Sequence, residues 1–259
     1  MRGLGLDVLI LGGASGVGAG LAEALHARGD KVLVADRVSV PDNRWETVSV
    51  DLLDDAGMDR LRERLERDFS AVDWLVCSAG GIDGMPLLDV EPERWRWMLD
   101  ANLVAVAASV IRLADSIRPG GKLVITGSGS GFVAPENGSG LGAYCVAKHA
   151  LLGYYRAVRQ ELRQRGVETV LMLPSGVKGG LAQNSARQRH ADKLEQAEQV
   201  RGAQPQDRAL VAARDAAEIM IAQILEGRAV VSNELEKMRA LLRAGFEDLD
   251  AAFDAIHEA

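Results

Sequence analysis

The chain has 259 residues, and its 30 Lys and Arg stand against 37 Asp and Glu for a formal net charge of -7. This charge argues against nucleic acid as the main partner, because phosphate binding needs a basic excess or a basic stripe. A chain of this length can form a core that needs no disulfide or structural metal, and Cys77 and Cys145 form no C-x-x-C pair. We therefore expect one domain, residues 1–259, in the cytoplasm, with no metal, signal peptide or membrane span.

Short aliphatic runs alternate with longer amphipathic stretches along the chain. The runs are nearly continuous in hydrophobicity and predict strands at 7–11, 31–36, 47–50, 73–77, 122–126, 168–173 and 228–231. The amphipathic stretches predict helices at 16–28, 54–68, 92–118, 142–165, 207–226 and 234–257. This order predicts an α/β fold, a doubly wound parallel sheet of about seven strands with helices on both faces.

Two segments depart from simple alternation. Residues 174–206 are polar, rich in Gln and Arg, and long for a connection, so we interpret them as a substrate lid. The alternative is a solvated surface helix without function. The C-terminal segment 234–257 has apolar residues at steps of three and four, which predicts an amphipathic helix. That helix covers either its own domain or a neighbouring subunit, and the sequence leaves the choice open.

A glycine-rich turn joins the first strand to the first helix. Its residues are Gly12, Ser15, Gly16, Val17 and Gly18. Glycines there allow a tight turn, a close approach of backbone to a pyrophosphate, and close packing of helix on strand. The helix N-terminus adds free N–H groups and a partial positive charge. The turn therefore predicts a phosphate-binding site, with a purely structural turn as the alternative.

Asp36 ends the second strand, near the offset at which an acidic residue accepts hydrogen bonds from an adenosine ribose. A carboxylate there would repel a 2′-phosphate, so we favour NAD over NADP. The neighbouring Arg37 could partly offset that repulsion.

Tyr144 and Lys148 stand at i and i+4 in the predicted helix 142–165, so they share one helical face. An ammonium near a phenol favours the phenolate, and it would bring the tyrosine pKa down from about 10 toward neutral pH. We therefore predict that Tyr144 is a proton donor or acceptor.

Together these residues resemble the classical short-chain dehydrogenases/reductases, and the resemblance covers nearly the whole chain. It implies a Rossmann-type fold in a single NAD(P)-binding domain, and hydride exchange between an alcohol carbon and a nicotinamide cofactor. By position, Tyr144 would be the general acid/base, and Lys148 would hold the nicotinamide ribose and lower the tyrosine pKa. Ser128 would bind the substrate oxygen, and Asn102 would position a water in a proton relay.

The choice of serine stays open at this stage. Ser130 fits the family's usual spacing to Tyr144 better than Ser128 does. We choose Ser128 because it follows the fifth strand directly, if the extra residues fall in the loop 134–142.

Further cofactor contacts are implied by the same resemblance. Asp51 and Leu52 would flank the adenine, Val177 would meet the carboxamide, and Ser78, Ala79 and Gly80 would lie beneath the cofactor. The sequence departs from the family at Cys77-Ser78, where two asparagines are usual, and at Gly179, where a threonine often contacts the carboxamide. The family's Asp-Gly-Gly after the last strand is also missing, so its common tetramer contacts cannot be assumed.

We therefore expect an NAD-dependent oxidoreductase of a secondary alcohol or ketone. Six glycines between Gly127 and Gly142 suggest an adaptable pocket for a bulky or hydrophobic substrate. The alternatives are an NADPH-dependent ketone reductase of a biosynthetic pathway and a non-catalytic nucleotide-sensing protein on the same fold. The expected partners are a small-molecule substrate and other copies of the chain, as a dimer or tetramer, without nucleic acid or membrane.

Overall fold

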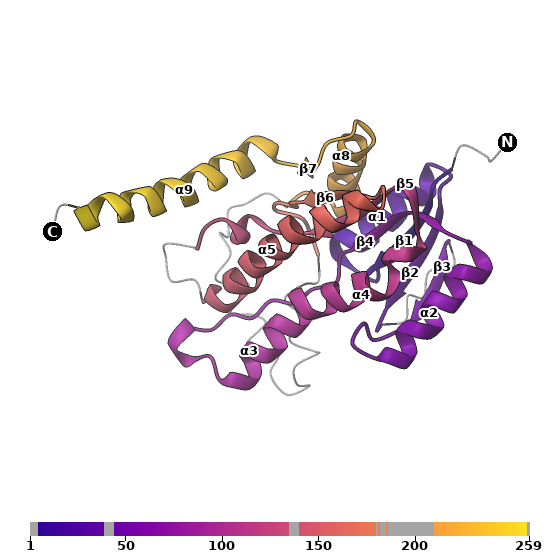
Figure 1. Cartoon of the computed structure of the whole chain (residues 1–259), viewed down its shortest axis with the longest axis horizontal. Coiled ribbons are helices and arrows are strands. Elements are labelled where there is room, and N and C mark those ends of the chain that lie inside the picture. The colour runs from indigo at the N-terminus through magenta and orange to yellow at the C-terminus, as the bar shows by residue number, and fades with distance from the viewer. Residues whose placement is uncertain are drawn as a thin grey trace.

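The computed structural model describes residues 5–38, 44–134, 140–179, 181, 185 and 210–257, with side chains as far as residue 247. A sheet of seven strands lies at its centre, in the order β3-β2-β1-β4-β5-β6-β7 (Figure 1). All neighbouring strands pair in parallel. The strands are β1 Asp7–Leu11, β2 Lys31–Asp36, β3 Glu46–Ser49, β4 Val72–Cys77, β5 Ile117–Thr126, β6 Glu168–Met172 and β7 Val230–Val231. The predicted doubly wound parallel sheet is confirmed.

Helices cover both faces of this sheet. They are α1 Gly16–Ala27, α2 Asp55–Asp68, α3 Pro92–Leu99, α4 Ala105–Leu113, α5 Gly142–Gln164, α8 Ala213–Leu225 and α9 Leu235–His257. Short helical turns connect them at η1 Leu87–Asp89, η3 Ala114–Ser116 and η4 Gly129–Gly131. Residues 207–209, which begin the predicted helix 207–226, lie outside the described residues.

The strands are hydrophobic on both sides because each side faces a helical layer. Leu9 and Leu11 of β1 join the core beneath α2, α4 and α5. Val8 and Ile10 of the same strand join the second core, beneath α1 and α8. Successive side chains of a strand point to opposite faces, so a continuous apolar run is what a sheet covered on both faces requires.

The predicted helix 92–118 is divided and ends earlier than expected. A π-helical turn, η2 Asp100–Val104, separates α3 from α4, and β5 already begins at Ile117. Pro119-Gly120-Gly121 therefore lies inside a strand, opposite a register shift between Val72 and Trp74, rather than after a helix. Such irregularities near the start of a strand allow residues that a regular ladder excludes.

One helical stretch, Pro92–Ser116, is long and apolar enough to cross a membrane by length and composition. In the fold, 44% of the relevant window is buried. Val106, Val110 and Leu113 of this stretch pack in the core against the sheet. Part of its apolar surface is therefore used in packing on the sheet.

The strand order reverses at β1, which lies between β2 and β4. Connections on the two sides of β1 therefore leave in opposite directions, and doubly wound folds bind their ligands outside the carboxyl ends of the strands at this point. The loops that follow β1, β4, β5 and β6 all meet at this edge. The predicted site residues come largely from these loops.

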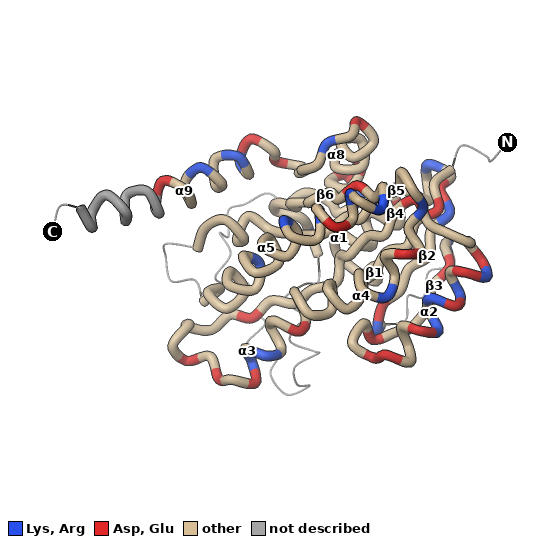
Figure 2. The backbone as a smooth tube through the Cα atoms, viewed as in Figure 1, with Lys and Arg blue, Asp and Glu red and all other residues tan. Residues whose placement is uncertain are grey.

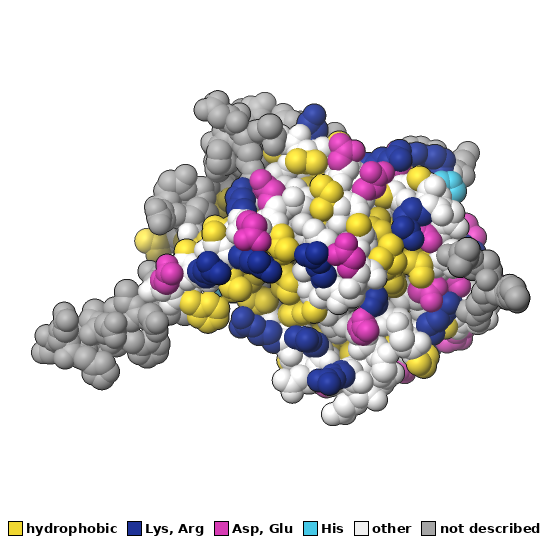
Figure 3. Space-filling model, turned by 90° about the horizontal axis from the view of Figure 1, so that it is seen from above, with side chains coloured by type: hydrophobic (Ala, Val, Ile, Leu, Met, Phe, Trp, Pro, Cys, Tyr) yellow, Lys and Arg dark blue, Asp and Glu magenta, His cyan; other side chains and the backbone are white. Residues whose placement is uncertain are grey.

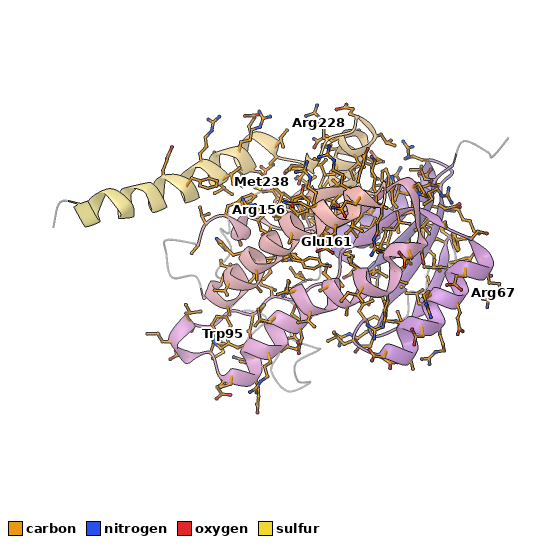
Figure 4. All side chains as sticks on the ribbon, viewed as in Figure 1. Arg67, Trp95, Arg156, Glu161, Arg228 and Met238 are labelled. Atoms are coloured by element: carbon orange, nitrogen blue, oxygen red, sulfur yellow. The ribbon has the colours of Figure 1, made fainter. Side chains whose placement is uncertain are left out.

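The C-terminal helix α9 begins beside the body of the molecule and then extends away from it (Figure 1). Its first turns pack on its own domain: Met238 is buried and points from α9 toward the rest of the fold (Figure 4). A Cβ built on Gly129 would lie 2.8 Å from Leu241 Cδ1. At its start, therefore, this helix covers its own subunit.

Charges of both signs are interspersed over the outer helices, and the strands are mostly uncharged (Figure 2). Seen from above, hydrophobic side chains gather among Lys and Arg side chains (Figure 3). Ile219 and Leu225 of α8 and Phe246 of α9 are exposed apolar residues. Most of the predicted lid, residues 180, 182–184 and 186–206, lies outside the described residues.

Candidate active site

The glycine turn after β1 is shaped by separate requirements at Gly12, Gly16 and Gly18. Gly12 has φ +82°, and a Cβ there would lie 2.3 Å from the backbone nitrogen of Ala79. A Cβ on Gly18, in the first turn of α1, would lie 2.1 Å from the carbonyl oxygen of Gly12. Gly16 has φ +55°, and its hypothetical Cβ meets nothing nearer than Gly179 Cα at 4.0 Å. Gly12 and Gly18 therefore allow the turn to pack against neighbouring backbone. At Gly16, by contrast, there is space beside the backbone.

The N-terminus of α1 carries no acidic residue in its first turn. The contrast is α2, whose N-terminus has Asp55 in its first turn and the Asp54 side chain accepting from Gly57 N. The positive end of α2 is thus matched by carboxylates of the chain itself, whereas that of α1 suits an external anion. Ser15 is the N-cap of α1, and Val17 packs against the core beneath this helix.

Asp36 lies at the end of β2 and braces the glycine turn. Its Oδ2 accepts a hydrogen bond from Ala14 N at 3.0 Å, and its Oδ1 accepts one from Val38 N at 3.1 Å. A carboxylate has about four lone-pair sites, so acceptor capacity remains for a ligand hydroxyl. Arg37 is half-exposed and pairs with Asp51, with Nη1 3.4 Å from Oδ2. Leu52 is buried in the core, so only its backbone can face a ligand.

The turn after β4 lies between the glycine turn and the residues around Asn102 and Lys148. Ser78 N donates to Leu11 O at 2.8 Å, and Ala79 is the residue against which Gly12 closes. A Cβ built on Gly80 would lie 2.9 Å from Asn102 Oδ1 and 3.7 Å from Lys148 Nζ. Residues 78–80 therefore lie between the glycine turn and the predicted catalytic residues.

Asn102 is fully buried in the π-helical turn η2. Its Nδ2 donates to Gly81 O at 2.8 Å and to Met98 O at 3.0 Å, and its Oδ1 accepts from Gly81 N at 3.3 Å. The side chain therefore holds the loop after β4 against the helix. Single π-helical turns are frequent at functional sites, since they redirect backbone groups out of the regular helical ladder.

Tyr144 lies near the start of α5 and is buried, and the neighbouring Ser128 acts to lower the pKa of its phenol. Ser128 follows β5 and caps the η4 turn, with Oγ accepting from Ser130 N at 3.2 Å. Ser130 instead acts to lower the pKa of the Cys145 thiol. Of the two serines considered from the sequence, Ser128 is the one that affects the phenol of Tyr144.

Lys148 lies one helical turn after Tyr144, and its side chain is also buried. Its Nζ donates to the carbonyl of Thr126 at 3.2 Å and lies 5.7 Å from the centroid of the Tyr144 ring. Asn102 and Lys148 thus both lie beside Gly80, and Tyr144 stands one helical turn before Lys148.

The pKa values of Tyr144 and Lys148 differ from what the sequence predicts. Burial raises the pKa of Tyr144 to about 12, and Ser128 acts in the opposite direction. Burial also lowers the pKa of Lys148 to about 8, because it disfavours the charged ammonium. The expectation that the protein alone brings the tyrosine pKa toward neutral is therefore wrong, since the cost of burying the phenolate is larger than the help from its neighbours.

The segment after β6 lies beside the glycine turn. Lys178 N donates to Val211 O, and Val211 N donates to Gly176 O, each at 2.8 Å. Val177 packs against the core on the α1 and α8 face. Gly179 lies over the glycine turn, where a Cβ on it would lie 3.0 Å from Gly16 Cα.

Two supporting residues escaped the sequence analysis. Asn233, after β7, accepts from Ser175 N at 2.9 Å and donates to Ser175 O at 2.7 Å, so it fixes the loop after β6. Thr126 supplies the carbonyl that Lys148 binds. Both contacts use backbone groups of distant segments, which residue types in the sequence do not reveal. Among the described residues, no group of three or more His, Cys, Asp or Glu side chains could hold a metal ion.

Known proteins match both the sequence and the fold. Residues 7–190 match the short chain dehydrogenase family. The 3-oxoacyl-(acyl-carrier-protein) reductase MabA of Mycobacterium avium is 30% identical over 170 residues, which are 65% of this chain and 66% of that protein.

Two solved structures extend the likeness to almost the whole fold. A short-chain dehydrogenase/reductase of Burkholderia phymatum, solved in complex with NAD, superposes with a TM-score of 0.78 at 23% identity, over 96% of this chain and 95% of that one. A short-chain dehydrogenase of Burkholderia cenocepacia, solved in complex with NADP, gives 0.75 at 22% identity, over 96% and 97%.

Proposed function

Because the chain belongs to the short-chain dehydrogenase family of oxidoreductases, we propose that it interconverts a secondary alcohol and its ketone by means of Tyr144 and Ser128. The observation that carries the proposal is the buried Tyr144, one helical turn before the buried Lys148, whose Nζ lies 5.7 Å from the tyrosine ring and donates to Thr126 O at the carboxyl end of β5. A nucleotide-sensing protein would need the glycine turn but would have no use for a buried phenol beside a buried lysine.

The nicotinamide cofactor fits the site by the chemistry of the residues around it. The open side of Gly16 and the α1 N-terminus suit the pyrophosphate, and Asp36 suits the adenosine ribose. Asp51 and Leu52 would flank the adenine, residues 78–80 and Lys148 would lie along the nicotinamide riboside, and Val177 would face the carboxamide. When bound, the nicotinamide ring accepts or supplies the hydride.

The chain's own residues manage the proton. Tyr144 Oη takes the hydroxyl proton during alcohol oxidation and returns it during ketone reduction. Ser128 donates a hydrogen bond to the oxygen on which negative charge develops. Lys148 places a positive charge near the phenol, and Asn102 fixes the loop at Gly81 next to the reacting groups.

We favour NAD over NADP. Asp36 keeps a carboxylate at the position of the ribose, and the guanidinium of Arg37 is already paired with Asp51. A 2′-phosphate would therefore meet a negative charge without a dedicated cationic partner. NADPH-dependent ketone reduction is the alternative, and it would require Arg37 to leave Asp51.

We further propose that the substrate is bulky or hydrophobic and that the protein forms homo-oligomers. The glycines of η4 and the buried Ile82 border the reacting groups and suit an apolar substrate. Residues 174–206 would close over it as a lid: Ser185 is buried and its Oγ accepts from Ile82 N at 2.9 Å. We infer a single-domain cytoplasmic enzyme with both cysteines reduced.

The activity is tested by absorbance at 340 nm with NAD and a panel of secondary alcohols, and with NADH and the matching ketones. Tyr144→Phe should lower kcat by about 100-fold or more. The control is Tyr155→Phe on the same helix, whose hydroxyl donates to Ala229 O and does not face the site residues. Equal turnover by wild type and Tyr144→Phe would refute the catalytic assignment.

Cofactor preference is tested separately by titrating NAD and NADP against the wild-type chain and Asp36→Asn. The amide removes the charge but keeps an oxygen that can accept from Ala14 N. We expect the ratio of NAD to NADP affinity to fall in the variant. A wild-type protein that binds NADP more tightly than NAD would establish the alternative.

A further inference from the structure

On the basis of the function proposed above, we propose that Met238 and Leu241 of helix α9 are positioning residues for Ser128. Both side chains lie against the η4 turn, and Ser128 is the residue that begins this turn. The C-terminal helix has no part in the function proposed so far. Through these two residues it holds a reacting group in place without touching the substrate.

The position of Ser128 depends on the turn that it begins. Ser128 is the N-cap of η4, and its Oγ accepts a hydrogen bond from Ser130 N at 3.2 Å. Its carbonyl oxygen accepts one from Gly131 N at 3.0 Å. On the other side, Gly127 N donates to Met172 O at 2.8 Å and so belongs to the sheet. Ser128 therefore lies between a fixed strand and a turn, and a shift of the turn would move its hydroxyl.

The η4 turn has little side-chain surface with which to hold itself in place. Two of its three residues are the glycines Gly129 and Gly131, and glycine has the freest backbone of all residues. A Cβ on Gly131 would lie 2.9 Å from the carbonyl oxygen of Lys148, so the turn rests directly on the backbone of α5. This contact restrains η4 on one side.

Helix α9 restrains the turn on a second side. A Cβ on Gly129 would lie 2.8 Å from Leu241 Cδ1 and 3.4 Å from Met238 Sδ. Because a 3₁₀-helix has three residues per turn, positions 129 and 131 point in different directions. The glycine at 129 therefore lets α9 approach the turn, as the glycine at 131 lets α5 approach it.

The contact continues one turn further along α9. A Cβ on Gly245 would lie 2.2 Å from the carbonyl oxygen of Phe132, which directly follows η4. Residues 238, 241 and 245 are three and four positions apart, so they share one face of the helix. Met238 points into the domain and is buried in its core, and Leu241 packs against the same core (Figure 4). One face of α9 thus lies along η4 and the residue after it.

The start of α9 is anchored to the body of the domain. Ser232 N donates to Gln223 Oε1 at 2.9 Å, and Gln223 Nε2 donates to Ser232 O at 3.0 Å. Asn233 forms two hydrogen bonds with the backbone of Ser175. These bonds tie the segment before α9 to α8 and to the loop after β6. The two positioning residues lie in the first two turns of the helix, close to this anchor.

The test exchanges volume between the turn and the helix. Gly129→Val adds as many carbon atoms to η4 as Leu241→Ala removes from α9, and changes that conserve volume are tolerated best. We expect each single variant to lower kcat in the 340 nm assay by about tenfold, with an unchanged Kd for NAD, because a displaced catalytic group loses rate and not cofactor binding. The double variant Gly129→Val/Leu241→Ala should recover most of the lost rate.

Two controls use the same helix. Leu241→Met keeps the volume of the side chain, and Phe246→Ala shortens a residue that is 57% exposed, so both should keep the wild-type kcat. Met238→Ala should behave as Leu241→Ala does, since both side chains face Gly129. The midpoint of thermal unfolding is measured for every variant, and rates are compared at a temperature at which all of them are folded.

Ser128→Ala is measured in parallel, so that the positioning role and the proposed function can fail separately. If Ser128→Ala loses activity while Gly129→Val and Leu241→Ala keep the wild-type kcat, the positioning role is refuted and the proposed function stands. A double variant no faster than Gly129→Val would also refute it, because the two surfaces would then not be fitted to each other. Full activity of Ser128→Ala would refute the catalytic role of this serine and the positioning role with it.

Discussion

Ser128, just after β5, acts on the phenol of Tyr144, in the first turn of α5, although the two residues belong to different elements. This matters because Tyr144 is buried, and burial raises the pKa of its phenol to about 12. Ser128 is the neighbour that lowers this pKa. The serine therefore has two effects, on the oxygen of the substrate and on the basicity of the tyrosine.

Replacing Ser128 with alanine should alter the pH dependence as well as the rate. Loss of the serine hydroxyl raises the tyrosine pKa, so the rising limb of kcat for alcohol oxidation should move to higher pH. We expect kcat to fall by about 100-fold at neutral pH. Stopped-flow or steady-state rates from pH 6 to 10 measure both effects, and Ser116→Ala, before β5 at the opposite edge of the sheet, is the control. An unchanged limb would show that Ser128 does not tune Tyr144.

Gly12 and Gly29 provide a matched pair for the glycine turn. Both have left-handed backbones, with φ of +82° and +88°, so alanine costs each about 1 kcal/mol of backbone strain. A Cβ on Gly12 also meets Ala79 N at 2.3 Å, whereas one on Gly29 meets nothing within 4 Å. Gly12→Ala should therefore lower the free energy of unfolding by about 2–3 kcal/mol more than Gly29→Ala.

Urea denaturation and NAD titration of both variants check this difference. Gly29→Ala should retain cofactor affinity, because Gly29 ends α1 far from the turn. Equal losses of stability in the two variants would mean that the turn can move away from Ala79.

The fold could be predicted from the sequence because the same signals for strands and helix ends recur along the chain. Each buried strand is an apolar run, and Gly29, Gly166 and Gly227 each follow a helix with the left-handed backbone that ends it. The division of the stretch 92–118 was not predictable, since the π-helical turn at Asn102 keeps the apolar periodicity that a continuous helix would have.

The site was less predictable, because its geometry depends on contacts between distant segments. Tyr144 and Lys148 share a helix, so their spacing alone brought them together. The choice between Ser128 and Ser130 depended on how η4 lies against α5, which no spacing in the sequence reveals. The raised pKa of Tyr144 likewise follows from burial, and burial is a property of the packed structure.

Asn102 should be important for stability as well as for the site. Asn102→Ala would leave Gly81 N and Gly81 O without their buried partner, at a cost of about 2–4 kcal/mol in the free energy of unfolding. Ser109→Ala is the matched control: it is equally buried, but its Oγ donates only to Ala105 O within its own helix, so about 0–1 kcal/mol is expected. Chemical denaturation measures both, and a loss at Asn102 no larger than at Ser109 would contradict the bridging role.

The contact of α9 with its own domain predicts whether a glycine-to-alanine change in this helix raises or lowers the stability of the protein. Alanine stabilises a helix by about 1 kcal/mol over glycine, so a helical Gly→Ala change normally raises stability. Gly153 in α5 is exposed, and a Cβ there meets nothing within 4 Å, so Gly153→Ala should stabilise the protein. A Cβ on Gly245 in α9 would lie 2.2 Å from the carbonyl oxygen of Phe132, so Gly245→Ala should destabilise it instead.

Phe132 directly follows η4, so displacing α9 should also disturb the turn that carries Ser128. We therefore expect Gly245→Ala to lower the midpoint of thermal unfolding and to reduce kcat several-fold, while Gly153→Ala leaves kcat unchanged. Scanning calorimetry and the 340 nm assay give the two readouts. If Gly245→Ala stabilises the protein as Gly153→Ala does, α9 does not rest on the Phe132 loop in solution, and the helix surface at Gly245 is free.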